Sequence, residues 1–190
     1  FRDDRYFYWT KTVKTGNYGK YLRQKIKSSV IETYFDGDKE KELCGSKYFG
    51  LGAISVSPND QLLAYSIDLK GSEYYDIFLR DISNNKIIEE KIKNTSGNIV
   101  WNLNSKSFFY TPLDKFHRSK KIYRHILGTP SKEDQLIFEE KNDSYSVSIS
   151  LTSDEKFFII SSSDSNTVEE YFFLEKEKEI KPKLFQAREK

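Results

Sequence analysis

The chain has 190 residues with 31 basic and 29 acidic side chains, so its net charge is only +2. This balance argues against nucleic acid as a partner, because phosphate recognition relies on a clear excess of Lys and Arg. Aromatic residues make up 15% of the chain, which argues against disorder, and no apolar run is long enough to cross a membrane. We therefore expect a folded chain whose partners are neither nucleic acids nor membranes.

The first predicted elements are two strands, residues 6–10 and 20–23, joined by a glycine-containing turn at 16–19. A short helical turn is expected from Glu40 to Gly45, without a strong cap. Mixed charges at 39–42, and again at 175–179, are typical of solvated loops or an exposed rim.

A repeat begins at Val56. Three segments, 56–65, 101–110 and 151–160, share one pattern: an apolar residue, a polar turn of about five residues, and a short apolar run. They start 45 and 50 residues apart (101 − 56 and 151 − 101). Each turn predicts a hairpin, and each apolar run predicts an inner strand buried on both faces.

Two more elements recur in every period. Alternating segments at 75–82, 121–126 and 170–174 are expected to be half-exposed outer strands. Each is followed by a polar turn and another apolar run, at 86–88, 135–138 and 183–185. Four antiparallel strands per 45 to 50 residues are typical of a propeller blade. We therefore predict an all-β fold: a partial β-propeller of three to four four-stranded blades over residues 1–190, with the ring incomplete and residues 6–23 ending an earlier blade.

Several stretches in order and at consistent spacing carry a family likeness: residues 48–52, 56–58, 63–73, 101, 108–111, 123–129, 138–140, 161–163 and 167–169. On these residues the chain resembles the N-terminal β-propeller of the prolyl oligopeptidase family of serine peptidases, and within it the oligopeptidase B (protease II) branch. Two departures are mild: Asp36-Gly37-Asp38 stands where relatives tend to carry Asp-x-Asn, and Thr167-Val168-Glu169 replaces a more usual Thr-Ser-Glu.

The resemblance implies a catalytic α/β-hydrolase domain with a G-x-S-x-G elbow and a Ser-Asp-His triad. No G-x-S-x-G occurs here, and the chain has no Met and begins with Phe1. We therefore expect a fragment that lacks the hydrolase domain and is inactive alone. By resemblance, its role is to restrict the active site to short peptides cleaved after Lys or Arg. The expected partners are the hydrolase domain or a companion fragment, with basic peptides bound only through that domain.

We predict no catalytic residue in this segment. His117 lies among cationic residues in what we expect to be an exposed loop, and His125 is expected on an outer strand. Cys44 is expected to be an ordinary free cysteine, residues 71–73 a turn between blade strands, and Trp101 a core residue between blades.

No cofactor or metal site is predicted either. One Cys and two His give no zinc spacing. Asp36-Gly37-Asp38 is weakly similar to a calcium loop, but Lys47 stands where the bidentate Glu belongs. A single cysteine and no visible secretory leader favour a cytoplasmic location. The alternative hypothesis is a non-catalytic propeller that serves as a protein-binding scaffold.

Overall fold

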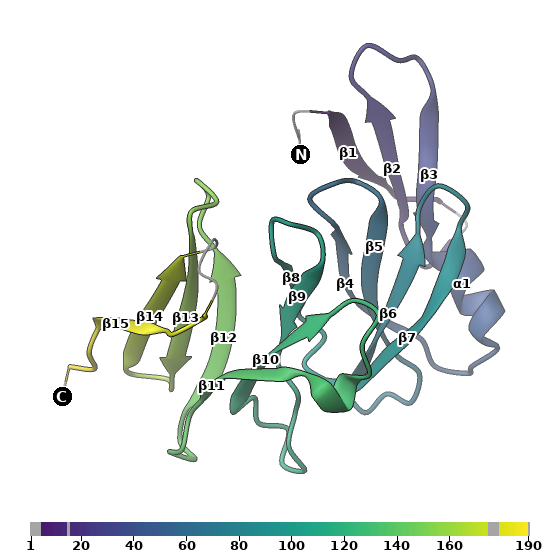
Figure 1. Cartoon of the computed structure of the whole chain (residues 1–190). Helices are drawn as coiled ribbons and strands as arrows, with labels where there is room; N and C mark the ends of the chain where they lie inside the picture. The colour runs from purple at the N-terminus through teal and green to yellow at the C-terminus, as the bar shows by residue number, and fades with distance from the viewer. Residues whose placement is uncertain (1–4, 15, 175–178, 190) are drawn as a thin grey trace.

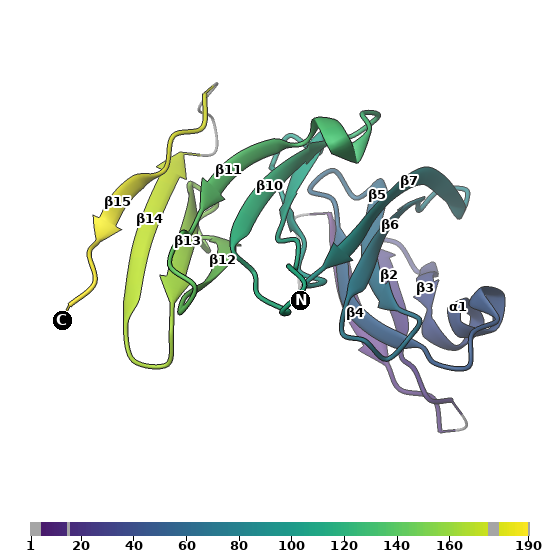
Figure 2. The same ribbon diagram turned by 90° about the horizontal axis from the view of Figure 1, so that it is seen from below.

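The structure, a computed structural model, describes residues 5–14, 16–174 and 179–189. Within these residues the chain forms four antiparallel sheets that follow one another along a curved row (Figures 1 and 2). Each sheet is hereafter called a blade. The first has three strands and the other three have four each, which confirms the predicted all-β blades. The strands are β1 (Tyr6–Lys11), β2 (Lys20–Lys25) and β3 (Ile31–Asp36) in the first blade; β4 (Gly50–Val56), β5 (Leu62–Asp68), β6 (Tyr75–Asp81) and β7 (Lys86–Thr95) in the second; β8 (Val100–Trp101), β9 (Ser107–Tyr110), β10 (Lys121–Ile126) and β11 (Gln135–Glu139) in the third; and β12 (Ser146–Leu151), β13 (Phe157–Ser163), β14 (Val168–Leu174) and β15 (Lys183–Gln186) in the fourth.

The repeated turn has the same conformation in three blades. Backbone hydrogen bonds close it from Ser57 N to Leu62 O (2.8 Å), from Asn102 N to Ser107 O (3.0 Å) and from Thr152 N to Phe157 O (2.9 Å). The fourth turn residue is left-handed each time, with φ of 60° at Asp60, 58° at Ser105 and 59° at Glu155. The tandem copies read from the sequence are therefore structural copies.

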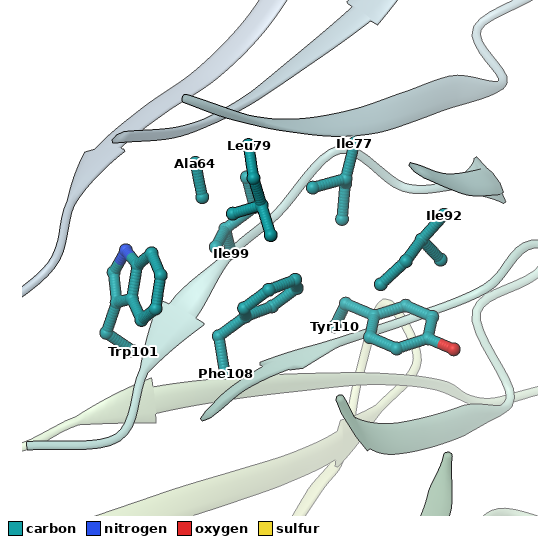
Figure 3. Close-up of a cluster of buried hydrophobic side chains, with 8 residues drawn as sticks. All are labelled: Ala64, Ile77, Leu79, Ile92, Ile99, Trp101, Phe108 and Tyr110. Carbon is teal, nitrogen blue, oxygen red and sulfur yellow. The ribbon is translucent and has the colours of Figure 1, made fainter. Parts of the chain in front are cut away.

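Apolar side chains pack between blades and form three interfaces, which we call the first, second and third seams. The first joins the first and second blades, the second joins the second and third, and the third joins the third and fourth. Both β5 and β9 are buried on two faces, as predicted, because a blade covers each side. By contrast, β13 buries only alternate residues, because only the third blade covers it among the described residues. Figure 3 shows the second seam, whose buried members are Ala64, Ile77, Leu79, Ile92, Ile99, Trp101, Phe108 and Tyr110.

The strands predicted to be half-exposed outer strands are partly exposed, but they are not the outermost strands of their sheets. β6, β10 and β14 are third in their sheets, because β7, β11 and β15 pair with their far edges. Buried residues such as Leu79 and Ile122 follow from that position.

The helical turn is longer and better capped than predicted. Helix α1 (Gly37–Cys44) begins at the N-cap Asp36, whose side chain accepts a hydrogen bond from Lys39 N, and ends at Gly45 in the left-handed region (φ 61°). These are a conventional polar N-cap and a glycine C-cap. The expectation of a solvated charge run is also wrong for Glu40, which is buried against the second blade. Most of the second charge run, 175–178, lies outside the described residues.

Candidate functional site

A cavity lies where the inner strands β4, β8 and β12 and their turns converge. Its volume is about 890 Å³, and it is partly open to solvent. Because β4, β8 and β12 are the first strands of consecutive blades, the cavity collects one edge from each of three sheets, and the first blade adds Tyr8 and Tyr34. It is lined by Arg5, Tyr8, Tyr34, Ile54, Ser55, Val56, Ser57, Pro58, Asp60, Ile99, Val100, Trp101, Leu103, Leu151 and Glu155.

Asp60 organises the polar wall of this cavity. Its Oδ1 accepts a hydrogen bond from the Tyr8 hydroxyl (2.6 Å), its Oδ2 pairs with Arg5 Nε (2.7 Å), and its backbone oxygen accepts from Arg23 Nη1 (2.6 Å). Burial, together with the neighbouring Asp60 carboxylate, raises the pKa of Tyr8 well above its usual value. Burial also raises the pKa of Tyr34 to about 12. These phenols are therefore neutral hydrogen-bonding groups at physiological pH, and none is a base.

The cavity wall contains no nucleophile with an activating base. Ser57 donates its hydroxyl to Asn59 Oδ1 (2.7 Å) instead of to an imidazole, and no histidine or cysteine is among the described residues that line the cavity. Nucleophilic catalysis needs a base within hydrogen-bond reach of the nucleophile. The arrangement can hold an extended or apolar ligand, but it offers no acyl-transfer chemistry. The absence of catalytic residues from the whole chain stays a prediction.

The two histidines lie apart from the cavity and from each other. His117 is exposed in the β9–β10 connection, as expected, with its ring 4.0 Å from that of Tyr74. His125 was expected on an outer strand, but it is 1% exposed on β10 in the second seam. Its ring nitrogens contact Asp134 Oδ1 (2.8 Å) and Glu90 Oε2 (3.0 Å).

The remaining candidate residues have structural environments. Trp101 is buried in the second seam, as predicted, and donates its indole N–H to Ser55 O (3.1 Å). Residues 71–73 form the β5–β6 turn, as predicted, where Asp68 accepts the N–H groups of Gly71 and Glu73. Cys44 is a free, partly buried cysteine whose thiol pKa is raised by burial.

The part of the chain that the structure describes was also compared with the requirements of a metal site and of a transmembrane helix. No cluster of three or more His, Cys, Asp or Glu side chains there is arranged to hold a metal ion. Asp36 caps α1 and pairs with Lys20 (2.9 Å), so it is already engaged. No helix among these residues has the length and apolar character needed for a transmembrane span.

One strand position recurs at the three seams, and it holds a buried polar side chain in two of them. Arg80, His125 and Phe173 each lie opposite the second residue of the preceding strand in their blade, namely Leu63, Phe108 and Phe158. In the first seam Arg80 Nη2 pairs with Glu40 Oε2 (2.6 Å), and both side chains are 6% exposed. The equivalence of Arg80, His125 and Phe173 becomes visible only when the pairing register of the strands is known.

A second recurrence lies 50 residues apart. Glu40, Glu90 and Glu140 each follow or belong to the outer strand of one blade, and each reaches into the next blade. Their partners are Arg80 in the first seam, His125 in the second, and Ser162 with Arg188 in the third. Each seam therefore combines an apolar core with a carboxylate of this series.

Consecutive antiparallel sheets of three or four strands, packed together through inter-blade cores, define this chain as a β-propeller segment. The sequence profile described as "Prolyl oligopeptidase, N-terminal beta-propeller domain" matches residues 1–190, so the chain belongs to that family.

Solved structures agree over nearly the whole chain. Oligopeptidase B from Leishmania major superposes with a TM-score of 0.92 at 27% identity, over 98% of this chain and 27% of that one. Oligopeptidase B from Trypanosoma brucei, in a closed form with covalently bound antipain, gives a TM-score of 0.88 at 30% identity, over 98% and 27%.

Curated relatives are peptidases. Protease 2 of Moraxella lacunata is 27% identical over 173 residues, which cover 87% of this chain and 25% of that protein. Dipeptidyl aminopeptidase BI of Pseudoxanthomonas mexicana is 33% identical over 118 residues, which cover 62% and 16%. The chain thus spans about a quarter or less of the length of these relatives.

Proposed function

We propose that this chain is the access-controlling part of an oligopeptidase B-like serine peptidase. Its blades cover the mouth of a hydrolase active site and admit short peptides that are cleaved after Lys or Arg. The observation that carries the proposal is the close match to two oligopeptidase B structures over 98% of the chain. The cavity supports it, because its wall joins all four described blades and carries no activated nucleophile.

The physical basis of the selection is steric. Blades locked together by buried seams form a stiff wall, and a stiff wall excludes a folded protein while a flexible peptide passes. The three apolar clusters and their inter-blade carboxylates supply that stiffness. Opening then requires motion between domains.

A chimera tests this role. Residues 1–190 replace the matching segment of oligopeptidase B from Trypanosoma brucei, and hydrolysis of a short Lys- or Arg-containing peptide is compared with hydrolysis of a folded protein substrate. We expect the chimera to cleave the peptide and to spare the folded protein. A folded chimera that degrades both substrates would refute access control, and one that binds a protein partner without supporting cleavage would favour the scaffold hypothesis.

We also propose a reducing, cytoplasmic location for this enzyme. The support is Cys44, the one cysteine of the sequence, which is free in the structure. Cell fractionation followed by thiol labelling checks this, and recovery with an oxidised Cys44 from a secreted fraction would contradict it.

A further inference from the structure

His125 occupies an unusual position for a buried histidine, because a carboxylate lies against each of its ring nitrogens. Nδ1 is 2.8 Å from Asp134 Oδ1, and Nε2 is 3.0 Å from Glu90 Oε2. The side chains of His125 and Asp134 are 2% and 1% exposed, and that of Glu90 is 18% exposed. Water therefore has little access to this triad.

This geometry discriminates between the protonation states of the ring. A neutral imidazole carries one N–H, so one ring nitrogen would direct a lone pair at a carboxylate oxygen. An imidazolium donates from both nitrogens and satisfies both carboxylates with charge-assisted hydrogen bonds. The pairing therefore favours the positively charged ring.

The triad also spans two blades. Glu90 belongs to β7 of the second blade, while His125 and Asp134 belong to the third blade. The second oxygen of Glu90 accepts a hydrogen bond from Gly128 N (2.9 Å), so both of its oxygens bind the third blade. Glu90 therefore links the second blade to the third through two contacts, one with His125 and one with Gly128 N. We call the His125, Glu90 and Asp134 contacts the clasp.

The other groups around the ring add no further charge. From β9, Phe108 packs its ring 5.2 Å from that of His125, and Tyr110 donates its hydroxyl to Asp134 Oδ2 (2.8 Å). Burial and Asp134 raise the pKa of Tyr110 above its ordinary value, so this hydroxyl keeps its proton. Glu90 from β7 and Asp134 after the β10–β11 connection are the charges that face the imidazole.

We propose that the second seam is closed by a pH-dependent clasp, in which the imidazolium of His125 bridges Glu90 of the second blade and Asp134 of the third, and that loss of its proton loosens these two blades. The first seam has the permanently charged Arg80 at the equivalent position, and the third has Phe173. Proton-dependent loosening between neutral and alkaline pH is thus assigned to the second seam.

The sign of the effect follows from the pKa of His125. Burial alone would lower this pKa, but hydrogen bonds and charge interactions with Asp134 and Glu90 outweigh burial and raise it above 6.5. A group with a raised folded-state pKa contributes its full stability below about pH 6.5, the unfolded value. That contribution is lost as the pH rises through the raised value.

The test combines NMR titration with urea unfolding of the 190-residue chain from about pH 5.5 to about pH 9, the range in which histidine titrates. The sequence has two histidines, so the variant His117→Gln assigns the His125 ring signals. We expect these signals to titrate above the ordinary histidine pKa of about 6.5, with the urea midpoint falling over the same interval. Titration of His125 at or below about 6.5 would overturn the proposal.

The variant Glu90→Gln separates a clasp from a merely buried histidine. The Gln amide can donate to the Nε2 lone pair, so neutral His125 becomes acceptable, and the fall in the urea midpoint should move to lower pH. Glu89→Gln, on the exposed face of the same strand, removes an equal charge without touching the triad. Coincident pH profiles for the two variants would overturn the proposal. Should Glu90→Gln fail to fold, the His125 titration in the unmodified chain decides the matter.

Discussion

The second and third seams show how one strand position is used in two chemical ways. Opposite the second residue of the preceding strand, the second seam has His125 and the third has Phe173. His125 lies between two carboxylates, whereas Phe173 stacks on Phe158 with ring centroids 5.1 Å apart and meets Phe109 edge-on at 5.6 Å. The pairing of strands within a blade places the residue at the seam, and the side chains of the neighbouring blade determine whether a charged or an apolar residue is stable there.

The two seams are expected to respond to pH in opposite directions, through His125 in the second seam and Glu140 in the third. In the third seam, burial acts to raise the pKa of Glu140, but hydrogen bonds from Ser162 and Asn142 N and the charge of Arg188 lower it to about 2. This seam therefore loses stability in acid, whereas the His125 clasp loses it in base. The propeller segment is expected to be tightest near neutral pH.

The largest expected effect concerns the apolar part of the second seam. Trp101→Ala removes a 5% exposed indole between two blades, and the resulting cavity should lower the free energy of unfolding by about 3–5 kcal/mol. Urea unfolding measures it. Trp9→Ala is the control, because Trp9 is 37% exposed on the first blade and should cost much less. Equal losses for both variants would contradict the placement of Trp101 in a seam core.

Phe173→His tests whether the third seam tolerates a histidine at the position that His125 occupies in the second seam. The third seam offers no carboxylate pair at this position among its described residues, so the imidazole would be buried without the partners that His125 has. We expect a loss of about 3 kcal/mol, from lost packing and an unsatisfied polar group. Thermal unfolding measures it, with Phe172→His on the opposite, partly exposed face as control. An unchanged Tm would show that this position accepts a histidine without carboxylate partners, which would contradict the prediction.

Glu140→Gln isolates the acid response. In the unmodified chain, the stability due to Glu140 is fully present above its unfolded pKa of about 4.5 and is lost as the pH falls towards 2. The variant should be less stable at neutral pH and should show a shallower loss in acid. Urea midpoints between about pH 3 and about pH 7 measure both. Glu139→Gln, one residue earlier and more exposed, is the matched control; equal slopes for the two variants would count against a role for Glu140.

The smallest effect concerns the repeated turns. Glu155→Gly relieves a non-glycine residue at φ 59° in an exposed position, and the net gain in stability should be about 0.5–1 kcal/mol. Asp60→Gly has the same backbone benefit (φ 60°) but loses the contacts to Tyr8 and Arg5, so it should destabilise. Differential scanning calorimetry compares them, and a shift of the same sign in both would show that the contacts of Asp60 contribute little.

Much of the fold was predictable because the repeat is local. Turn residues such as Ser57 and Thr152 hydrogen-bond to backbone five residues away. The residues that determine each hairpin are therefore adjacent in the sequence. Strand β3 was missed because its sequence, Ile31–Asp36, mixes polar and apolar residues without a repeat partner. The N-cap of α1 was missed because the predicted helical turn begins only at Glu40, and Asp36-Gly37-Asp38 is weakly similar to a calcium loop.

The polar seam positions were not predictable from one sequence. Glu90 and His125 are 35 residues apart and belong to different blades, so only the stacking of sheets brings them together. Glu40 appeared to be one charge in a solvated run, because its buried partner Arg80 lies 40 residues downstream. Alternating patterns reveal which face of a strand is apolar, but they do not reveal which neighbour meets a charged residue on that face.

The central claim is that this chain supplies shape and closure, while the acyl-transfer chemistry lies elsewhere. The most direct measurement is treatment of the 190-residue chain with a fluorophosphonate serine probe, followed by intact-mass and peptide mass spectrometry. The account predicts no adduct, because Ser55 and Ser57 at the cavity have no imidazole beside them. Stoichiometric labelling of either serine in the folded chain, abolished by unfolding, would contradict it.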